Sequence, residues 1–494
     1  MPSMRLGGRG ARGLCLGIAT ALAVLPAPVA YAHHAGEHVP SPHDVEFEGE
    51  SMSVPATVGD KPASSGAYLN SALRLKTNGT ATKTVTTTRE TVHVFVRTRG
   101  DWCNGDPAIK VEVGNQVVYE GTAGPAPVTG SSYAWIGRRA SIPAGTHTVK
   151  VSFTNDVSLA PVCDRNVWVD AVSLVASPFS PTGWRNTPLA SNAPIASNSA
   201  ALRGELIDQI DDDRQSGSGA GAWVGFDRWT PPVYVVPFEQ PKVNVIPDVR
   251  PELTEQWTGV PLPPDARVSQ GSAATPEESD RSLILWQPST DTLWEFVGLG
   301  KDGNGNWHGY YGGKMPKVSQ HQGHWEGGSL DAGDQFGASA TSLSMLAGLQ
   351  RLKELQRGVI DHAIDFGVTT PRGARAFCWP AQRTDEGLSL DPNAIPAGTR
   401  FRLPAGLDLD AMPMHPYARM VAKAVQKYGM VARDSTGLPT LWAEDEFQTG
   451  EPGAYMAMWN ADPSARPGGI LDRFPWAQLE ALAPVESGCE TAPR

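Results

Sequence analysis

The chain has 494 residues, a formal net charge of −11 at pH 7, 52 glycines and 42 prolines. This length exceeds what one hydrophobic core normally holds and predicts two or three domains. The acidic balance argues against a protein that binds nucleic acid or anionic membranes, and the abundant Gly and Pro favour short strands and turns over a helical bundle.

The first 32 residues have the pattern of a signal peptide. Three arginines precede an apolar run at residues 14–25, and Ala30-Tyr31-Ala32 fits a small-x-small cleavage site. The apolar run is too short to span a bilayer, and no second run of about 18 apolar residues follows. Removal of residues 1–32 would take the net charge from −11 to −14. We therefore expect a secreted, monomeric protein with no membrane segment.

Two regions follow a short flexible leader at residues 33–43. Residues 44–176 alternate apolar and polar side chains with period two, and turn signals such as Asn78-Gly79 separate the runs. Regular short strands of this kind predict an all-β antiparallel sandwich. Residues 177–199, rich in Pro, Ser and Asn, predict a linker or an irregular segment leading into the next domain.

Residues 200–494 mix strand and helix patterns and predict a β-rich α+β domain, so the whole chain is expected to be multidomain. Residues 282–297 read as a hairpin, and residues 416–429 as an amphipathic helix that ends at a glycine. Leucines at helical spacing predict another helix over residues 342–358, and residues 359–368 predict a short helix or a helix-to-strand transition. The acidic run at 211–213 is predicted to be a solvated turn, and the run at 444–446 is predicted to lie on the surface.

Four cysteines remain after the predicted cleavage site. An even number of cysteines in a secreted chain suggests disulfides. Three connectivities are possible. The simplest, local to each half of the chain, pairs Cys103 with Cys163 and Cys378 with Cys489.

The loop between the last two predicted strands of the sandwich concentrates carboxylates. Asp156, Asp164 and Asp170 lie there without a nearby lysine, and the first strand adds Glu46 and Glu48 on one face. Carboxylates gathered at one end of a sandwich repel each other unless a cation holds them, and hard oxygen ligands suit calcium. The alternative is that Asp156 and Asp164 only cap turns.

The segment AGTHTVKVSFTND…DRNVWVDAVSL resembles the calcium-dependent, xylan-binding type of β-sandwich carbohydrate-binding module. The resemblance covers roughly residues 44–176. It implies a structural calcium held by Glu46, Glu48 and Asp170, and a second, sugar-contacting calcium at Asp156 and Asp164. The loop departs from the family pattern because Cys163 lies beside Asp164 and the usual tryptophan and glycines are absent.

Tryptophan is concentrated in the C-terminal region, where 12 of the 15 residues lie at or after Trp184. Trp307, Trp325 and Trp379 have polar neighbours that are typical of glycan grooves, and Trp102 could extend a sugar site in the sandwich, because aromatic rings stack on the apolar faces of sugars. Packing in the core or in loops is the alternative for each of them.

Paired carboxylates are what glycoside hydrolysis normally requires. Asp280 and Glu295 are the predicted pair, since Glu295 alternates with Trp294 and Phe296 in a strand and is expected to line a cleft. His362, with Asp365 three residues on, is the predicted assisting acid or base. Arg383 is predicted to bind substrate, or else to pair with Asp385. A weak HxxH pattern at His321 and His324 leaves a metal site as an alternative.

The C-terminal motifs, among them SDRSLILW, WHGYYGGKM, CWPAQRTD and ARMVAKAVQKYGMVARD, resemble a largely uncharacterised family of secreted, often actinobacterial, proteins. We expect a glycoside hydrolase that acts on a plant cell-wall polysaccharide of the xylan or cellulose class and requires calcium in its binding module. The alternatives are a lyase acting on a uronate-containing glycan, with His362 or Tyr310 as base, and a non-catalytic glycan-binding protein. The sequence has no G-x-S-x-G elbow, P-loop or dinucleotide fingerprint.

Overall fold

The computed structural model describes residues 41–124, 132–215, 221–271, 279–326, 337–373, 376–384, 389–459, 467–484 and 489–491. The predicted signal peptide, most of the predicted leader and Asp385 lie outside these ranges.

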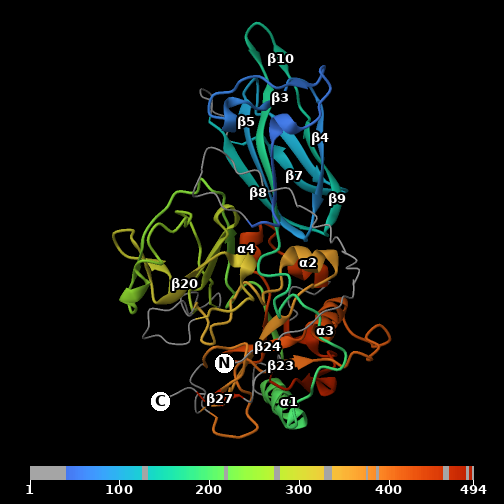
Figure 1. Cartoon of the computed structure of the whole chain (residues 1–494), viewed down its shortest axis with the longest axis vertical. Coiled ribbons are helices and arrows are strands. Elements are labelled where there is room, and N and C mark those ends of the chain that lie inside the picture. Colours follow the sequence, from blue (N-terminus) through green and yellow to red (C-terminus); the bar gives the residue numbers. More distant parts are fainter. Residues whose placement is uncertain are drawn as a thin grey trace, which may run out of the picture.

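Two antiparallel sheets form the N-terminal sandwich, at the top of Figure 1. The first sheet has the order β2-β3-β12-β5-β8, with β1 also paired to β12. Its strands are β1 (Val45–Glu48), β2 (Gly59–Asp60), β3 (Leu73–Leu75), β5 (Thr91–Asp101), β8 (Ala134–Ile142) and β12 (Asn166–Ala176). The second sheet has the order β4-β9-β6-β7, with strands β4 (Gly79–Thr87), β6 (Ala108–Val113), β7 (Gln116–Thr122) and β9 (Gly145–Phe153).

The core of the sandwich follows from the period-two pattern. Val94 and Val96 of β5 point inward, as do Val149 and Val151 of β9, and all four are buried in one cluster. Successive side chains of a strand point to opposite faces, so alternating valines fill the space between two sheets. The predicted antiparallel sandwich is therefore confirmed.

The C-terminal region is built from smaller sheets. A mixed six-stranded sheet has the order β13-β25-β21-β24-β23-β26, and a four-stranded sheet has the order β14-β16-β17-β20. The strands of the first are β13 (Trp223–Gly225), β21 (Ile364–Val368), β23 (Arg400–Arg402), β24 (Met430–Ser435), β25 (Thr440–Trp442) and β26 (Glu480–Ala481). Those of the second are β14 (Val233–Val235), β16 (Leu283–Gln287), β17 (Thr292–Val297) and β20 (Tyr311–Pro316).

Two minor sheets and five α-helices complete the described part of this region. The minor sheets are β15 (Val245–Pro247) with β18 (Gly300–Lys301) and β19 (Trp307–Gly309), and β22 (Ala376–Phe377) with β27 (Glu490–Thr491). The helices are α1 (Ser199–Gln215), α2 (Leu352–Arg357), α3 (Pro416–Lys427), α4 (Glu446–Thr449) and α5 (Ala454–Trp459). The predicted β-rich α+β class is confirmed. Among the described residues, none of the helices is long and apolar enough to cross a membrane.

The hairpin and the amphipathic helix predicted for the C-terminal region are both present. β16 and β17 pair antiparallel as the predicted hairpin. Helix α3 begins after His415, whose ring accepts a hydrogen bond from the Tyr417 amide, and Gly429 follows it with φ +86°. A glycine adopts this left-handed conformation without the steric cost of a Cβ, which is why the helix ends there.

The predicted helix over residues 342–358 is wrong except for its last turns. Leu343, Leu346 and Leu349 are buried as expected, but they lie in irregular backbone, and only α2 is helical. The amides of Met345 and Leu346 donate to the Glu295 carboxylate at 3.1 Å each. Amides bound to a side chain in this way are not available for i→i−4 helical bonds, so the segment wraps a carboxylate instead of coiling.

Three further predictions for local structure are wrong in whole or in part. Residues 359–368 contain no helix, but residues 364–368 form strand β21, so only the strand of the predicted helix-to-strand transition is present. The acidic run at 211–213 lies in helix α1, where Arg214 pairs with Asp211 three residues earlier. The run at 444–446 is buried, because Glu444 pairs with Arg139 and Asp445 caps helix α4 by accepting hydrogen bonds from the Phe447 and Gln448 amides.

The sandwich is packed directly against the C-terminal region. Phe95 and Val175, on the outer face of its first sheet, belong to one hydrophobic cluster with Ile284, Trp286 and residues around them. Residues 177–198 contain no helix or strand, but Phe179 and Trp184 within them are buried. This segment is therefore irregular and anchored, and the domain boundaries at 176 and 199 stay predictions.

Candidate functional site

The end of the sandwich that points away from the C-terminal region carries the acidic loop. A small hairpin, β10 (Ser158–Leu159) and β11 (Cys163–Asp164), forms the tip at the top of Figure 1. The Cys103–Cys163 disulfide ties this hairpin to the end of β5. Beside it Trp102 is 49% exposed. The second predicted pair, Cys378–Cys489, is also bonded.

Arg165 organises the backbone beneath this tip. Its buried guanidinium donates to the carbonyl oxygens of Cys103, Asn104 and Asn155 at 2.5–3.0 Å. Two chain segments, at 103–104 and at 155, thus converge on one cation, which fixes the loop without using the carboxylates around it.

The loop aspartates lie close together. One oxygen of Asp156 is buried without a hydrogen-bond partner, while Asp164 is exposed. Burial raises the pKa of Asp156, and the neighbouring charge of Asp164 raises it further. A buried carboxylate oxygen with no donor, beside a second carboxylate, is a favourable position for a cation.

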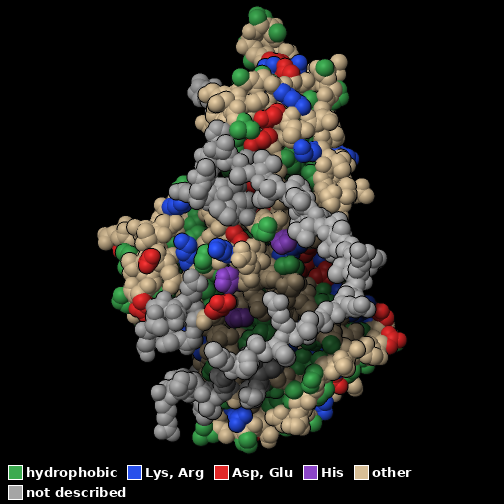
Figure 2. Space-filling view, in the orientation of Figure 1, with side chains coloured by type: hydrophobic (Ala, Val, Ile, Leu, Met, Phe, Trp, Pro, Cys, Tyr) green, Lys and Arg blue, Asp and Glu red, His purple; other side chains and the backbone are tan. Residues whose placement is uncertain are grey.

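A second acidic group lies at β1 and β12. Both carboxylate oxygens of Glu48 are buried without a hydrogen-bond partner, as is one oxygen of Glu50. Burial raises the pKa of Glu48 to about 8, and the charges of Asp170, Glu50 and Glu46 add to the shift. Figure 2 shows acidic side chains in red on the surface of the sandwich, in the upper part of the view.

Asp170 differs from the other members of this group, because it already has partners. It is fully buried, accepts a hydrogen bond from the Tyr68 amide at 2.9 Å and forms an ion pair with Arg97. Within the described ranges no three His, Cys, Asp or Glu side chains are arranged as a ready metal site. Glu48, Glu50 and the Asp156–Asp164 pair therefore fit calcium by their unpartnered oxygens, whereas Asp170 is in part committed to Arg97.

A large cleft lies in the C-terminal region, where strands β13, β24 and β25 end. Its volume is about 640 Å³. Aromatic and charged side chains share its lining, namely Trp223, Trp229, Trp442, Arg228, Arg433, Asp280 and Asp434. Ligand sites are commonly mostly apolar cavities of this size with a few polar groups, and tryptophan rings stack well on sugars.

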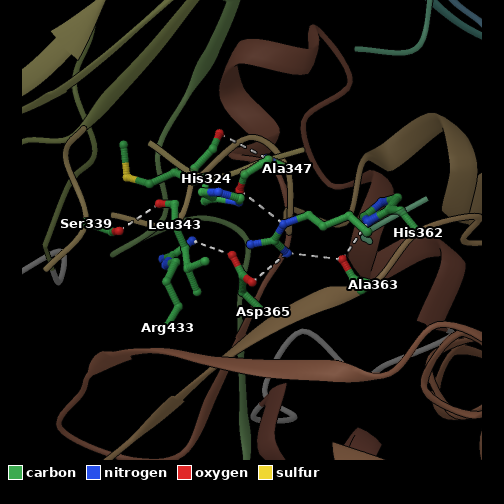
Figure 3. A network of polar contacts seen from close by, with 12 residues as sticks. His324, Ser339, Leu343, Ala347, His362, Ala363, Asp365 and Arg433 are labelled. Atoms are coloured by element: carbon green, nitrogen blue, oxygen red, sulfur yellow. Dashed lines mark hydrogen bonds and ion pairs between the residues drawn. The ribbon is translucent and has the colours of Figure 1, made fainter. Parts of the chain in front are cut away.

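Asp434 is held rigidly at the wall of this cleft. Its carboxylate accepts from the Ala340 amide at 3.1 Å and from Arg433 Nε at 3.2 Å. Arg433 also contacts the buried Asp365 at 3.5 Å and lies 3.7 Å from the centre of the Trp442 ring. Figure 3 shows Arg433 beside Asp365, which in turn binds Arg185 at 2.7 Å. A row of alternating charges thus runs from the core to Asp434.

The predicted catalytic residues are not brought together. Asp280 is exposed and lines the cleft, but the prediction that Glu295 lines a cleft is wrong. Glu295 is fully buried and binds the Ser344 hydroxyl at 2.6 Å, in addition to the two amides already described. Burial raises its pKa in spite of these bonds. The side chain does point away from Trp294 and Phe296, but the 344–346 segment covers it.

His362 also lies elsewhere, and its predicted pairing with Asp365 is wrong. It is buried, its Nε2 is 3.2 Å from Glu354, and it lines a separate cavity of about 300 Å³ at the junction with the sandwich. Arg383 donates to the Ser339 carbonyl at 2.7 Å. Neither residue lines the 640 Å³ cleft.

Two of the tryptophans predicted to bind substrate are core residues. Trp325 is fully buried and Trp307 is nearly so, each within a hydrophobic cluster. Trp379 is half-buried, packs edge-on against Trp184 and lines a cavity of about 190 Å³ near the Cys378–Cys489 disulfide. Of the predicted binding tryptophans, Trp102 is the one whose ring is largely exposed.

The sequence interpretation named Asp280 but missed the other six aromatic and charged residues that line the cleft, among them Trp223, Trp229 and Asp434. Asp434 lies near the end of strand β24, which follows helix α3, so a carboxylate near the end of a buried strand was the available signal. Trp223 follows a glycine-rich stretch and Trp229 comes six residues later, and neither gave a periodic signal that distinguishes a cleft from a loop.

Residues 91–179 match the family model CBM60, described as a Ca-dependent carbohydrate-binding module that is xylan-binding. The match contains Trp102, Asp156, Asp164 and Asp170 and agrees with the predicted resemblance. No curated protein matches the chain. The resemblance of the C-terminal region to secreted actinobacterial proteins has no support from these comparisons.

Solved structures with similarity to this chain include three isolated modules. A CBM36-1 domain of a multidomain xylanase from the hindgut metagenome of Trinervitermes trinervoides has 14% identity, covers 27% of this chain and 98% of its own, and has a TM-score of 0.22. A CBM36 module in complex with calcium and xylotriose has 17% identity, coverages of 26% and 97%, and a TM-score of 0.21. A family 35 module from Clostridium thermocellum has 9% identity, coverages of 27% and 98%, and a TM-score of 0.23.

Proposed function

We propose that this chain is a secreted glycoside hydrolase that captures a xylan-type polysaccharide with calcium at the outer end of its sandwich and cleaves it in the 640 Å³ cleft. The observation that carries the binding step is the Asp156–Asp164 pair. It has a buried, unpartnered oxygen, lies beside the exposed Trp102, and belongs to the segment that matches a calcium-dependent xylan-binding family.

Calcium bound at this loop would supply open coordination positions for sugar hydroxyls. The residues of the chain would hold the cation, stack on the sugar and fix the loop. Asp156 and Asp164 hold the cation, the Trp102 ring offers an apolar face to a pyranose, and Arg165 with the Cys103–Cys163 disulfide keeps the loop in place. Glu48 and Glu50 are proposed to hold the structural calcium.

For the chemical step, Asp280 and Asp434 replace the pair predicted from the sequence. Both line the same tryptophan-walled cleft, and Asp434 is oriented by two hydrogen bonds. In glycoside hydrolysis one carboxyl group protonates the leaving oxygen while the other attacks the sugar or activates water. Trp229 and Trp223 would hold the chain on either side of the scissile bond.

Binding is tested by titrating xylo-oligosaccharides into the full chain with calcium or with a chelator. We expect the affinity to fall at least tenfold on chelation and in Asp164→Asn, and to be unchanged in Asp265→Asn, which removes an exposed carboxylate elsewhere. Equal affinity with and without calcium would refute the binding step.

Cleavage is tested by reducing-sugar release from a panel of polysaccharides. Asp434→Asn and Asp280→Asn should each lower the rate by about 10²–10⁴-fold, with Asp265→Asn as control. Products that absorb in the unsaturated-uronide band would instead indicate a lyase. Binding without soluble products from any polysaccharide would indicate a non-catalytic glycan-binding protein.

A further inference from the structure

One wall of the cleft combines two tryptophans and an arginine. The Arg228 guanidinium lies 5.1 Å from the centre of the Trp223 ring and 5.5 Å from that of Trp229. Trp229 is 45% exposed and has φ +50°, a left-handed conformation that is unusual for a bulky residue. Strained backbone of this kind tends to occur at functional sites, and here it presents a large ring to the cleft.

The charge of Arg228 is incompletely matched within the described residues. Within the part of the chain that the structure describes, its one ion-pair contact is with Asp227, at 3.6 Å from Nε to Oδ1, which is longer than a hydrogen bond. Nε is buried and makes no hydrogen bond, and neither does that Asp227 oxygen. Arg433, the other guanidinium of the cleft, contacts two carboxylates. Arg228 therefore retains donors that can bind a ligand.

A guanidinium with free donors on the wall of a cleft is suited to binding the carboxylate of a ligand. Its planar fork matches a carboxylate with two parallel hydrogen bonds. An aromatic platform beside it is suited to a sugar ring. A sugar whose ring rests on Trp229 while its own carboxylate reaches Arg228 satisfies both features at once, which a neutral pentose or hexose does not.

We propose that the cleft recognises a uronic acid residue of its glycan, with Arg228 as the carboxylate-binding residue and Trp229 as the stacking platform. This proposal rests on the proposed function, because it names the substrate class of the same cleft. Arg228 binds the acidic sugar and takes no part in bond cleavage. The preferred polysaccharide is accordingly a xylan decorated with glucuronate.

The test compares xylotriose with xylotriose that carries one glucuronate, each titrated into the full chain. The Asp164→Asn variant serves as the background, so that the outer loop does not contribute to the signal. The acidic sugar should bind about 10- to 100-fold more tightly, the range expected for hydrogen bonds to a charged group. Arg228→Gln should abolish this preference, and Arg228→Lys should keep a part of it. Arg267→Gln, which removes a guanidinium 4.3 Å from the Phe447 ring, is the matched control.

Equal affinity for the two sugars, an unchanged preference in Arg228→Gln, or no binding of the acidic sugar would each overturn the uronate assignment. These outcomes leave the proposed function standing if xylan cleavage still depends on Asp434. Conversely, an Arg228-dependent preference for the acidic sugar without any cleavage would support uronate recognition while refuting hydrolysis.

Discussion

Arg139 is the residue whose loss should most weaken the attachment of the sandwich to the C-terminal region. Its guanidinium forms an ion pair with Glu444 and donates to the carbonyl oxygens of Gln448 at 2.8 Å and Val233 at 2.6 Å. Glu444 is buried, and its second oxygen accepts from the Leu352 amide at 3.3 Å. Arg139→Ala therefore leaves a buried carboxylate with one weak hydrogen bond and removes three contacts across the junction.

Removal of one partner from a buried ion pair costs about 3–5 kcal/mol. For a chain of this size, unfolding carries an entropy of about 1 kcal/mol per degree at about 2.1 cal/mol/K per residue, so the melting temperature should fall by about 3–5 °C. The neighbouring Arg138 is the matched control. Its side chain is exposed and donates to the Gly137 carbonyl, so Arg138→Ala should change the stability by less than about 0.5 kcal/mol.

Thermal and urea unfolding of the two variants would measure this difference, with limited proteolysis to report on opening of the junction. Arg139→Ala should expose residues 177–198 to protease under conditions in which Arg138→Ala resists. If the two variants unfold alike and are cut alike, the ion pair with Glu444 does not hold the two regions together.

Three other changes test separate parts of the structure. Glu295→Gln should lower the free energy of unfolding by about 2–4 kcal/mol, because an amide cannot accept from all its present donors; normal stability with lost cleavage would instead restore Glu295 as a catalytic residue. Cys103→Ser should cost about 2–4 kcal/mol and weaken xylan binding through loss of loop order, and undiminished binding would show that the loop is held without the disulfide. Burial raises the pKa of Asp445 from 3.8 to about 7, so this carboxyl group favours folding most below pH 4 and loses that contribution as the pH rises to 7. Asp445→Asn can still cap α4. As the pH rises from 4 to 7, its free energy of unfolding should therefore rise by up to about 4 kcal/mol relative to that of the wild type, as measured by melts across this range. A difference that stays constant with pH would contradict the pKa shift.

Period-two alternation predicted the sandwich because alternate side chains of its strands fill one shared apolar core. The same rule correctly placed Glu295 opposite Trp294 and Phe296. It could not show that the opposite face is covered, because the covering segment lies about 50 residues later in the sequence. Strand periodicity tells which side chains share a face, and only the tertiary fold tells whether that face meets water.

The spacing of the leucines at 343, 346 and 349 led to a wrong helix prediction, again because the tertiary contacts of the segment cannot be read from the sequence. Helical spacing of apolar residues normally reports one helical face, but a buried irregular segment can satisfy the same spacing when its amides bind a carboxylate instead of the backbone. Asp434 was missed because a single aspartate near the end of a strand is common. Its importance depends on Ala340 and Arg433, which orient it from another segment and from the adjacent position.

The fixed attachment of the sandwich has a consequence for substrate length. Strand β12 extends 11 residues from the acidic loop to the junction, or about 35 Å, and the cleft lies wholly within the C-terminal region. A short oligosaccharide cannot contact the loop and the cleft together, whereas a polymer held at the loop has a raised local concentration at the cleft. Asp164→Asn should therefore slow the cleavage of polymeric xylan at least tenfold at low substrate concentration while leaving the cleavage of xylotetraose unchanged, as followed by chromatography of the products. An equal effect on polymer and oligomer would mean that the outer loop influences the cleft through the fold and does not act by holding the chain.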